Sequence, residues 1–172
     1  GFSILARYCS SLQENLHVRD PRLEAVALRM VEAGVRIRSI DRTRAERDLC
    51  AIHTLAVEAF RDAFLFSPIG ASAFLEQYTR LLPLVRDELV LIAERHGEAV
   101  AFLFALPDAL ERVRGAAPRT VILKTVAARP GRMYAGIAHA LADRAATAAA
   151  GLGYGRVVHA LQKERGISNV FL

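Results

Sequence analysis

The sequence has few cysteines, few lysines and no long apolar run. Its 172 residues include two cysteines, Cys9 and Cys50, which form no CxxC motif and have no histidine partner at zinc-binding spacing. We therefore expect no metal site. Two isolated cysteines are typical of a reducing compartment, which predicts a cytoplasmic protein. No apolar run approaches the ~20 residues that span a bilayer, and the N-terminus lacks the pattern of a secretory signal, so we expect no membrane association.

Lysine is nearly absent, and arginine carries almost all of the positive charge. The net charge is +5, and the only lysines are Lys124 and Lys163. The arginines are scattered among acids, as in RTRAERD (42–48) and LVRDEL (84–89). Scattered charge is typical of a solvated surface rather than a nucleic-acid-binding stripe, so we expect no nucleic-acid partner. The length suffices for one domain with a substantial core.

Hydrophobic periodicity and turn residues predict the order of elements along the chain. Residues 1–19 show little periodicity and are expected to form a loop. A polar segment around Gly115 and Pro118 is expected to form a second loop. We predict helices over 20–34, 44–63, 72–82 and 134–150, and strands over 35–41, 89–94, 98–106, 120–128 and 156–163.

Two local patterns give pairing information. The strands 89–94 and 98–106 are separated by the short turn Arg95-His96-Gly97, which predicts a β-hairpin. The strand, helix and strand over 120–163 predict a crossover between parallel neighbours. The glycines of GLGYG (151–155) follow a helix rather than a strand, so we interpret them as a helix end and turn, not a dinucleotide motif.

The stretch ILKTVAARPGRMYAGIAHAL (122–141) passes from a strand through a glycine-bearing turn into a helix. A helix start exposes unpaired backbone N–H groups at the positive end of the peptide dipoles, and these together can bind an anion. Gly136 and the small Ala138 leave room for phosphate oxygens near the backbone. The residues predict a phosphate cradle at about Met133–Ala138, with a purely conformational role for the glycine as the alternative.

The element order and this turn resemble the GNAT acyltransferases. That family places a Q/R-x-x-G-x-G/A turn between its fourth strand and third helix, and the turn's amides hold the pyrophosphate of acetyl-CoA. The corresponding residues here are Met133, Tyr134, Ala135, Gly136, Ile137 and Ala138. The resemblance covers about residues 35–172 and implies an α/β fold, an open mixed sheet with helices on both faces. Residues 1–34 are then an N-terminal extension with one helix.

The sequence departs from the family pattern in three places. Met133 replaces the usual glutamine or arginine, with Arg132 beside it, and Tyr134 is bulky where relatives often have glycine. The sequence ends at Leu172, about where a fourth helix and two last strands should follow. The C-terminal strands are therefore apparently missing, through truncation or because another segment supplies them.

The resemblance implies acyl transfer from acetyl-CoA, or a related acyl-CoA, to an amine by direct attack, without a metal. The cofactor's pantetheine arm would pair with the backbone of Val126, Ala127 and Ala128 between two diverging strands. Asn169 falls where relatives place an asparagine near the cofactor. The alternative is a catalytically silent module that binds acyl-CoA as a sensor or scaffold. The acceptor would be a small-molecule or peptide amine, and the oligomeric state, including a homodimer, stays open.

Three side chains are candidates for the base that deprotonates the amine. Lys124 lies within an apolar strand, and a lysine withdrawn from water can act as a base or hold a carboxylate substrate. His159 on the next strand and Glu94 at a hairpin strand end are the others. An outward-facing lysine, a structural histidine and a structural glutamate are the alternatives. Phe64 and Phe66 are predicted to line the acceptor pocket, with core packing as the equal alternative.

Overall fold

The computed structural model describes residue 1 and residues 3–163, the last three of these by their backbone alone. The strands are β1 Tyr8–Gln13, β2 Val35–Ser39, β3 Val90–Arg95, β4 Glu98–Pro107, β5 Thr120–Ala128 and β6 Arg156–Lys163. The helices are α1 Arg22–Glu32, α2 Ala45–Phe60, α3 Ala71–Leu81, α4 Ala109–Val113 and α5 Ile137–Gly151. Short 3-10 turns lie at 42–44, 82–84, 87–89 and 132–134. No helix in this described part is long and apolar enough to cross a bilayer.

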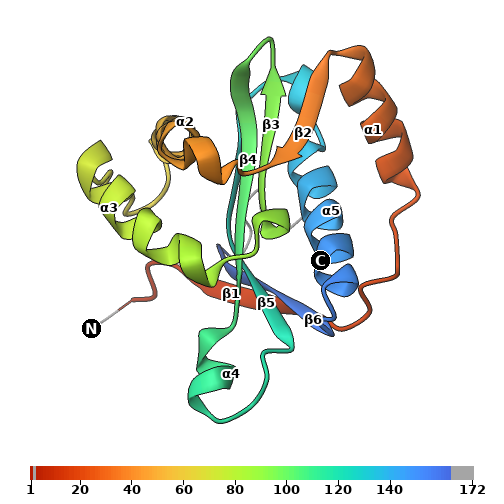
Figure 1. The fold of residues 1–172 in the computed structure, drawn as a ribbon. Coiled ribbons are helices and arrows are strands. Elements are labelled where there is room, and N and C mark those ends of the chain that lie inside the picture. The colour runs from red at the N-terminus through yellow and green to blue at the C-terminus, as the bar shows by residue number, and fades with distance from the viewer. Residues whose placement is uncertain (2, 164–172) are drawn as a thin grey trace.

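The described strands form one sheet in the order β1-β6-β5-β4-β3-β2 (Figure 1). The pair β5 and β6 is parallel and every other neighbouring pair is antiparallel. The predicted hairpin is confirmed: β3 and β4 pair across His96 and Gly97, whose φ angles of 52° and 80° suit a tight two-residue turn. The predicted parallel pairing of the strands on either side of α5 is also confirmed.

Helices cover both faces of the sheet, and each face has its own core (Figure 1). On one face, α1 and α5 contribute Met30, Ile137 and Leu141 to a core that includes Leu91 and Leu103 of the sheet. On the other face, the buried side chains of α2 and α3 pack against alternate residues of the same strands. That second core includes Leu49, Ile52, Phe74, Tyr78, Val90, Ile92, Phe102 and Phe104. The central strands β3 and β4 are apolar on both faces because both faces are buried.

Two predicted loops contain regular structure. Residues 8–13 form β1, which pairs antiparallel with β6. This strand lies at the edge of the sheet and alternates between exposed and half-buried side chains, so backbone pairing rather than burial holds it in place. The polar segment before β5 contains α4, whose first turn is capped by the Asp108 carboxylate accepting from the Leu110 amide at 2.9 Å. The segment predicted as an N-terminal extension therefore supplies an edge strand and a covering helix to the same sheet.

Candidate acyl-CoA site

The strands β5 and β6 are paired over only part of their length. Residues 120–123 pair with residues 156–159, and the last pair is Leu123 with His159. Beyond it, β5 stays paired with β4 as far as Ala128, while β6 stays paired with β1 as far as Lys163. The two strands therefore part, as predicted, and we call the opening beyond Leu123 and His159 the fork.

The backbone of β5 is directed into the fork at alternate residues. The Arg129 amide donates to the Val100 carbonyl at 2.8 Å, which fixes the hydrogen-bonding phase of the β4–β5 ladder. In an antiparallel ladder, residues alternate between hydrogen-bonded and non-bonded pairs. Ala127 is thereby bonded to β4, while the N–H and C=O groups of Val126 and Ala128 are directed away from it. Of the three residues predicted to pair with pantetheine, two have main-chain groups facing the fork.

The predicted phosphate cradle forms the start of α5. The 3-10 turn Arg132–Tyr134 is closed by the Tyr134 amide donating to the Gly131 carbonyl at 3.0 Å, and Gly136 then caps the helix. At the N-terminal end of α5, the Ala140 amide donates a hydrogen bond to the Gly136 carbonyl at 3.0 Å. The amides of Ile137 and Ala138 precede it, at the positive end of the helix dipole. Met133 is exposed, whereas the Ile137 side chain is fully buried in the core.

Gly136 has the conformational role that we gave as the alternative, and it also has a steric role that the sequence did not reveal. Its φ of 86° is left-handed, and a Cβ built there would lie 2.9 Å from a methyl carbon of Val26 on α1. The Arg29 guanidinium, one turn further along α1, donates to the Ala135 carbonyl. The space beside this glycine, which we had expected to receive phosphate oxygens, is occupied by α1. Any anion at this turn must therefore approach the amides of Ile137 and Ala138 from the end of the helix.

A β-bulge at Lys124 directs two consecutive side chains to the same face of the sheet. Phe104 pairs with Thr125, yet the next residue, Ala105, pairs with Leu123, so Lys124 is an extra residue on β5. Lys124 and Thr125 consequently both line a pocket between the sheet and helices α2 and α3. An unbulged strand would have placed them on opposite faces.

The pocket has a volume of about 270 Å³, and its lining includes His53 and the four aromatic residues Phe60, Phe66, Phe74 and Tyr78, so we call it the aromatic pocket. It is lined by His53, Ala56, Val57, Phe60, Phe66, Ser67, Ile69, Phe74, Gln77, Tyr78, Lys124 and Thr125. Phe74 and Tyr78 stack with ring centroids 4.1 Å apart, and His53 contacts Phe74 at 5.0 Å. Phe66 lies in this wall, where it contacts Phe60 at 5.9 Å, whereas Phe64 is not among the lining residues.

Comparison with known proteins finds matches among solved structures but not among protein families or curated sequences. No protein-family model and no curated protein matches the chain. Among solved structures, a GCN5-related N-acetyltransferase from Sphaerobacter thermophilus superposes with a TM-score of 0.60 at 19% identity, over 78% of this chain and 38% of that one. A GNAT family acetyltransferase from Brucella melitensis, solved with acetyl-CoA, gives 0.54 at 20% identity, over 71% and 72% of the two chains.

This chain has the GNAT fold. An N-acetyltransferase from Staphylococcus aureus Mu50 adds a third match, with a TM-score of 0.52 at 17% identity over 70% of this chain and 68% of that one. The chain spans well under half of the Sphaerobacter protein. The predicted fold class, an open mixed sheet with helices on both faces, is confirmed.

Within this GNAT fold, Lys124 is a hydrogen-bonded cation at the start of the fork. Its ammonium donates to the Tyr78 hydroxyl at 2.7 Å and lies 5.0 Å from the centre of the Tyr78 ring. The residue is exposed, which agrees with the outward-facing alternative rather than with a lysine withdrawn from water. Tyr78 itself was not predicted as a site residue. Its spacing of four from Phe74 places both on one helix face, a pattern that core packing explains equally well.

His159 flanks the fork from the opposite face. It pairs with Leu123, and paired residues on parallel strands direct their side chains to the same face, here the α5 side. Its Nε2 atom lies 3.4 Å from the Gln13 amide oxygen on β1. Burial lowers the pKa of His159 below its ordinary value, so the imidazole is neutral at pH 7. Lys124 and His159 are thus close along the strands, but they project to different faces of the sheet.

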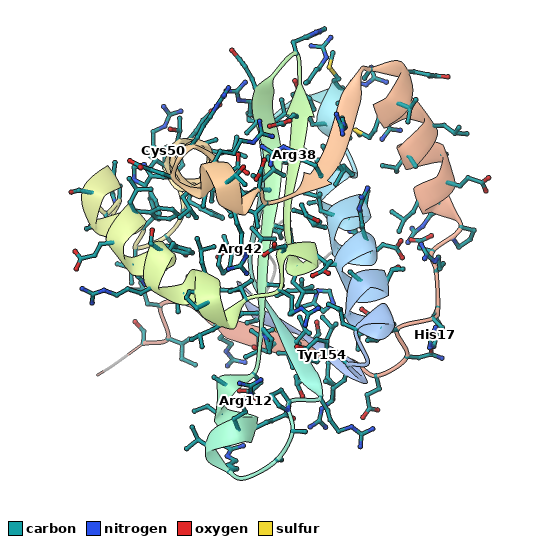
Figure 2. All side chains as sticks on the ribbon, in the orientation of Figure 1. His17, Arg38, Arg42, Cys50, Arg112 and Tyr154 are labelled. Carbon is teal, nitrogen blue, oxygen red and sulfur yellow. The ribbon has the colours of Figure 1, made fainter. Side chains whose placement is uncertain are left out.

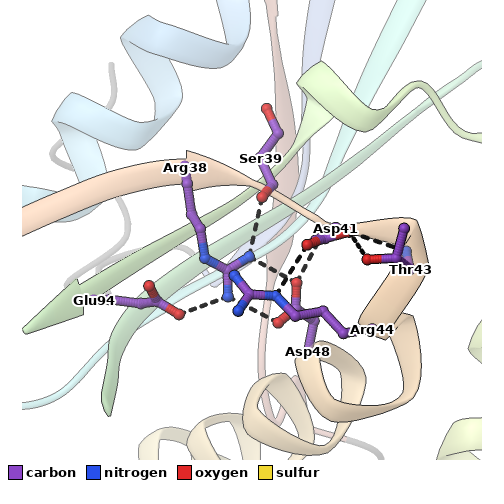
Figure 3. A network of polar contacts seen from close by, with 7 residues as sticks. All are labelled: Arg38, Ser39, Asp41, Thr43, Arg44, Asp48 and Glu94. Atoms are coloured by element: carbon purple, nitrogen blue, oxygen red, sulfur yellow. Dashed lines mark hydrogen bonds and ion pairs between the residues drawn. The ribbon is translucent and has the colours of Figure 1, made fainter. Parts of the chain in front are cut away.

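Glu94 belongs to an ion-pair network away from the fork (Figure 3). The Arg38 guanidinium contacts Glu94 at 2.5 Å and the buried Asp48 carboxylate at 2.7 and 2.8 Å. The hydrogen bond from Arg38 lowers the pKa of Glu94, which keeps the carboxylate ionised and occupied. Glu94 lies on β3, two strands from Lys124 across the sheet, and it is also displaced along the strands, because Glu94 pairs with Ala99 whereas Lys124 lies opposite Phe104 and Ala105. The structure does not bring it together with the other two candidates.

The remaining predicted residue, Asn169, lies outside the described residues. Within the described part, no group of three or more histidine, cysteine or acidic side chains is placed to hold a metal ion. The candidate site therefore consists of the fork, the start of α5 and the aromatic pocket, which meets the fork at Lys124 and Thr125.

Proposed function

We propose that this protein transfers an acetyl or other acyl group from acyl-CoA to an amine by direct attack. The observation that carries the proposal is the fork. Val126 and Ala128 direct main-chain groups into it, and within the described residues β6 offers them no partner, because its pairing with β5 ends at Leu123. An extended ligand with alternating amide donors and acceptors suits such an edge, since it adds a strand to β5.

The other residues of the site fit the two ends of that ligand. The amides of Ile137 and Ala138 at the start of α5 would hold the pyrophosphate, with Arg132 close by in the chain. Acyl-CoA supplies an activated thioester. The chain's own contribution is to fix the thioester beside the aromatic pocket and to accept a proton from the attacking amine. A nitrogen–carbon bond forms and the carbon–sulfur bond breaks. CoA leaves as the thiolate and becomes the thiol by taking up a proton equivalent to the one that the base removed from the amine.

Of the three predicted bases, we favour His159. A protonated amine is no nucleophile, so a neutral acceptor of its proton is needed. The Lys124 amino group is held in a hydrogen bond to the Tyr78 hydroxyl, and Glu94 is paired with Arg38. His159 lies next to the first residue of the fork with its side chain on the α5 face, so the proton of an amine in the aromatic pocket would pass through the fork to reach it. Its lowered pKa keeps the imidazole neutral at pH 7.

The test is amide hydrogen exchange by NMR, with and without CoA, followed by turnover of acetyl-CoA. Binding in the fork should slow exchange of the Val126 and Ala128 amides. The Ala127 amide, which is bonded to β4, is the internal control and should not change. If CoA binds and leaves Val126 and Ala128 unaffected, or does not bind, the proposal is wrong. Protection without turnover of any amine would leave only the binding module.

A further inference from the structure

The charge of the aromatic pocket indicates which acceptor it would bind, because its lining includes a basic side chain and no acidic one. Lys124 is the one lysine or arginine among its lining residues, and those residues include no aspartate or glutamate. Within the described part of the chain, no carboxylate lies within ion-pair distance of the Lys124 ammonium. Several arginines elsewhere in the described chain differ in this respect: Arg38, Arg42, Arg80 and Arg129 all have acidic partners.

The Lys124 ammonium has donors left for a ligand. It carries three N–H groups, and among the residues that the structure describes one of them has a protein partner, the Tyr78 hydroxyl at 2.7 Å. The Tyr78 ring lies beneath it at 5.0 Å, and Tyr78 is held in turn by stacking on Phe74 and an edge contact with Phe104 at 5.0 Å. The exposed cation is therefore held in position by Tyr78 in the lining of the pocket, next to the fork.

We infer that the acceptor is an amine that also bears a carboxylate and an apolar or aromatic side chain, as in an apolar α-amino acid. The carboxylate is bound by Lys124, and the side chain packs between Phe66 and Phe74. This inference rests on the proposed acyl transfer and names its acceptor class. Polyamines are disfavoured, because each further positive charge would enter a pocket that holds a cation and no acid.

The size of the pocket agrees with a small acceptor. Its volume of about 270 Å³ lies just below the ~300–1,000 Å³ usual for ligand sites, which leaves space for one amino-acid side chain. The bulge at Lys124 is what connects the two parts of the site, because it directs Lys124 and Thr125 into the pocket at the residue where the fork begins. The amine of a bound acceptor is thereby held beside the thioester.

The experiment compares matched pairs of acceptors with and without a carboxylate. Acetyl-CoA turnover is measured with phenylalanine against 2-phenylethylamine and with leucine against isoamylamine, with spermidine as a polycation. The carboxylate-bearing member should be favoured in kcat/KM by about tenfold or more, as expected for a hydrogen bond to a charged group. Lys124→Met should remove that preference, and Lys124→Arg should retain it.

Controls distinguish a failure of this acceptor class from a failure of the proposed acyl transfer on which it rests. Arg112→Met removes a positive charge from α4, which lies at the far end of the molecule from α2 (Figure 2), and should leave every rate unchanged. A calorimetric titration with phenylalanine and 2-phenylethylamine reads acceptor binding without CoA. Equal rates within each pair, faster turnover of spermidine, or a preference that survives Lys124→Met would each overturn the inference. If CoA protects Val126 and Ala128 but no carboxylate-bearing amine binds, the acceptor class is wrong and the CoA site stands.

Discussion

The contact between α1 and the start of α5 gives a prediction that can be worked out from the structure. Gly136→Ala should destabilise the protein through two separate effects. The left-handed φ of 86° costs an L-residue about 1–2 kcal/mol. The new Cβ would lie 2.9 Å from a Val26 methyl carbon, and such overpacking costs about 1–3 kcal/mol. The total, about 2–5 kcal/mol, would be among the larger effects of a single substitution.

A second substitution separates the two effects. Val26→Ala removes the atoms that the new Cβ would meet, and costs about 1 kcal/mol by itself because Val26 is only half buried. In the double variant the steric part of the Gly136→Ala penalty should disappear, while the backbone part stays. The expected coupling is about 1–3 kcal/mol in favour of the double variant.

Urea unfolding of the wild type, both single variants and the double variant measures this coupling. For a chain of this size, each 1 kcal/mol also shifts the melting temperature by about 2–4 °C. Leu28→Ala is the matched control, because Leu28 lies on α1 but is exposed, and its coupling to Gly136→Ala should be near zero. If Gly136→Ala costs the same with and without the Val26 side chain, α1 does not pack on this turn in solution.

Two further predictions concern titratable groups. His159→Asn should lower the kcat of acyl transfer by about 100-fold or more. It should also abolish the rise in rate through a pKa below 6.5, while the protection of the Val126 amide by CoA stays unchanged. A retained pH profile would exclude His159 as the base. Hydrogen bonds from Thr120 and its neighbours lower the pKa of the Glu111 carboxyl to about 2. The ionised Glu111 therefore contributes stability that is present above its unfolded pKa of 4.5 and is lost as the pH falls through about 2. Glu111→Gln should therefore cost about 1–3 kcal/mol in urea unfolding at pH 7 and nearly nothing at pH 2, and an equal loss at both pH values would contradict this account.

The sequence by itself determined the parts of the fold that depend on local signals. The β3–β4 hairpin follows from two apolar strands around His96-Gly97, and the parallel pair β5–β6 follows from a strand, a helix and a strand in succession. The helix α5 was predicted from about Tyr134, three residues before its start at Ile137, from one glycine after a proline-bearing turn. Turn chemistry and hydrophobic periodicity act within a few residues, so they can be recognised in the sequence.

Tertiary structure alone decided what surrounds those elements. The edge strand β1 has no strong sequence pattern, since its stability comes from backbone pairing with β6, about 150 residues later in the chain. The bulge at Lys124 depends on the register against β4, and the contact of Tyr78 with Lys124 joins a helix and a strand that are 46 residues apart. Val26 fills the space beside Gly136 because α1 packs on α5. Register and long-range packing are set by the balance of many contacts at once, so no local pattern in the sequence records them.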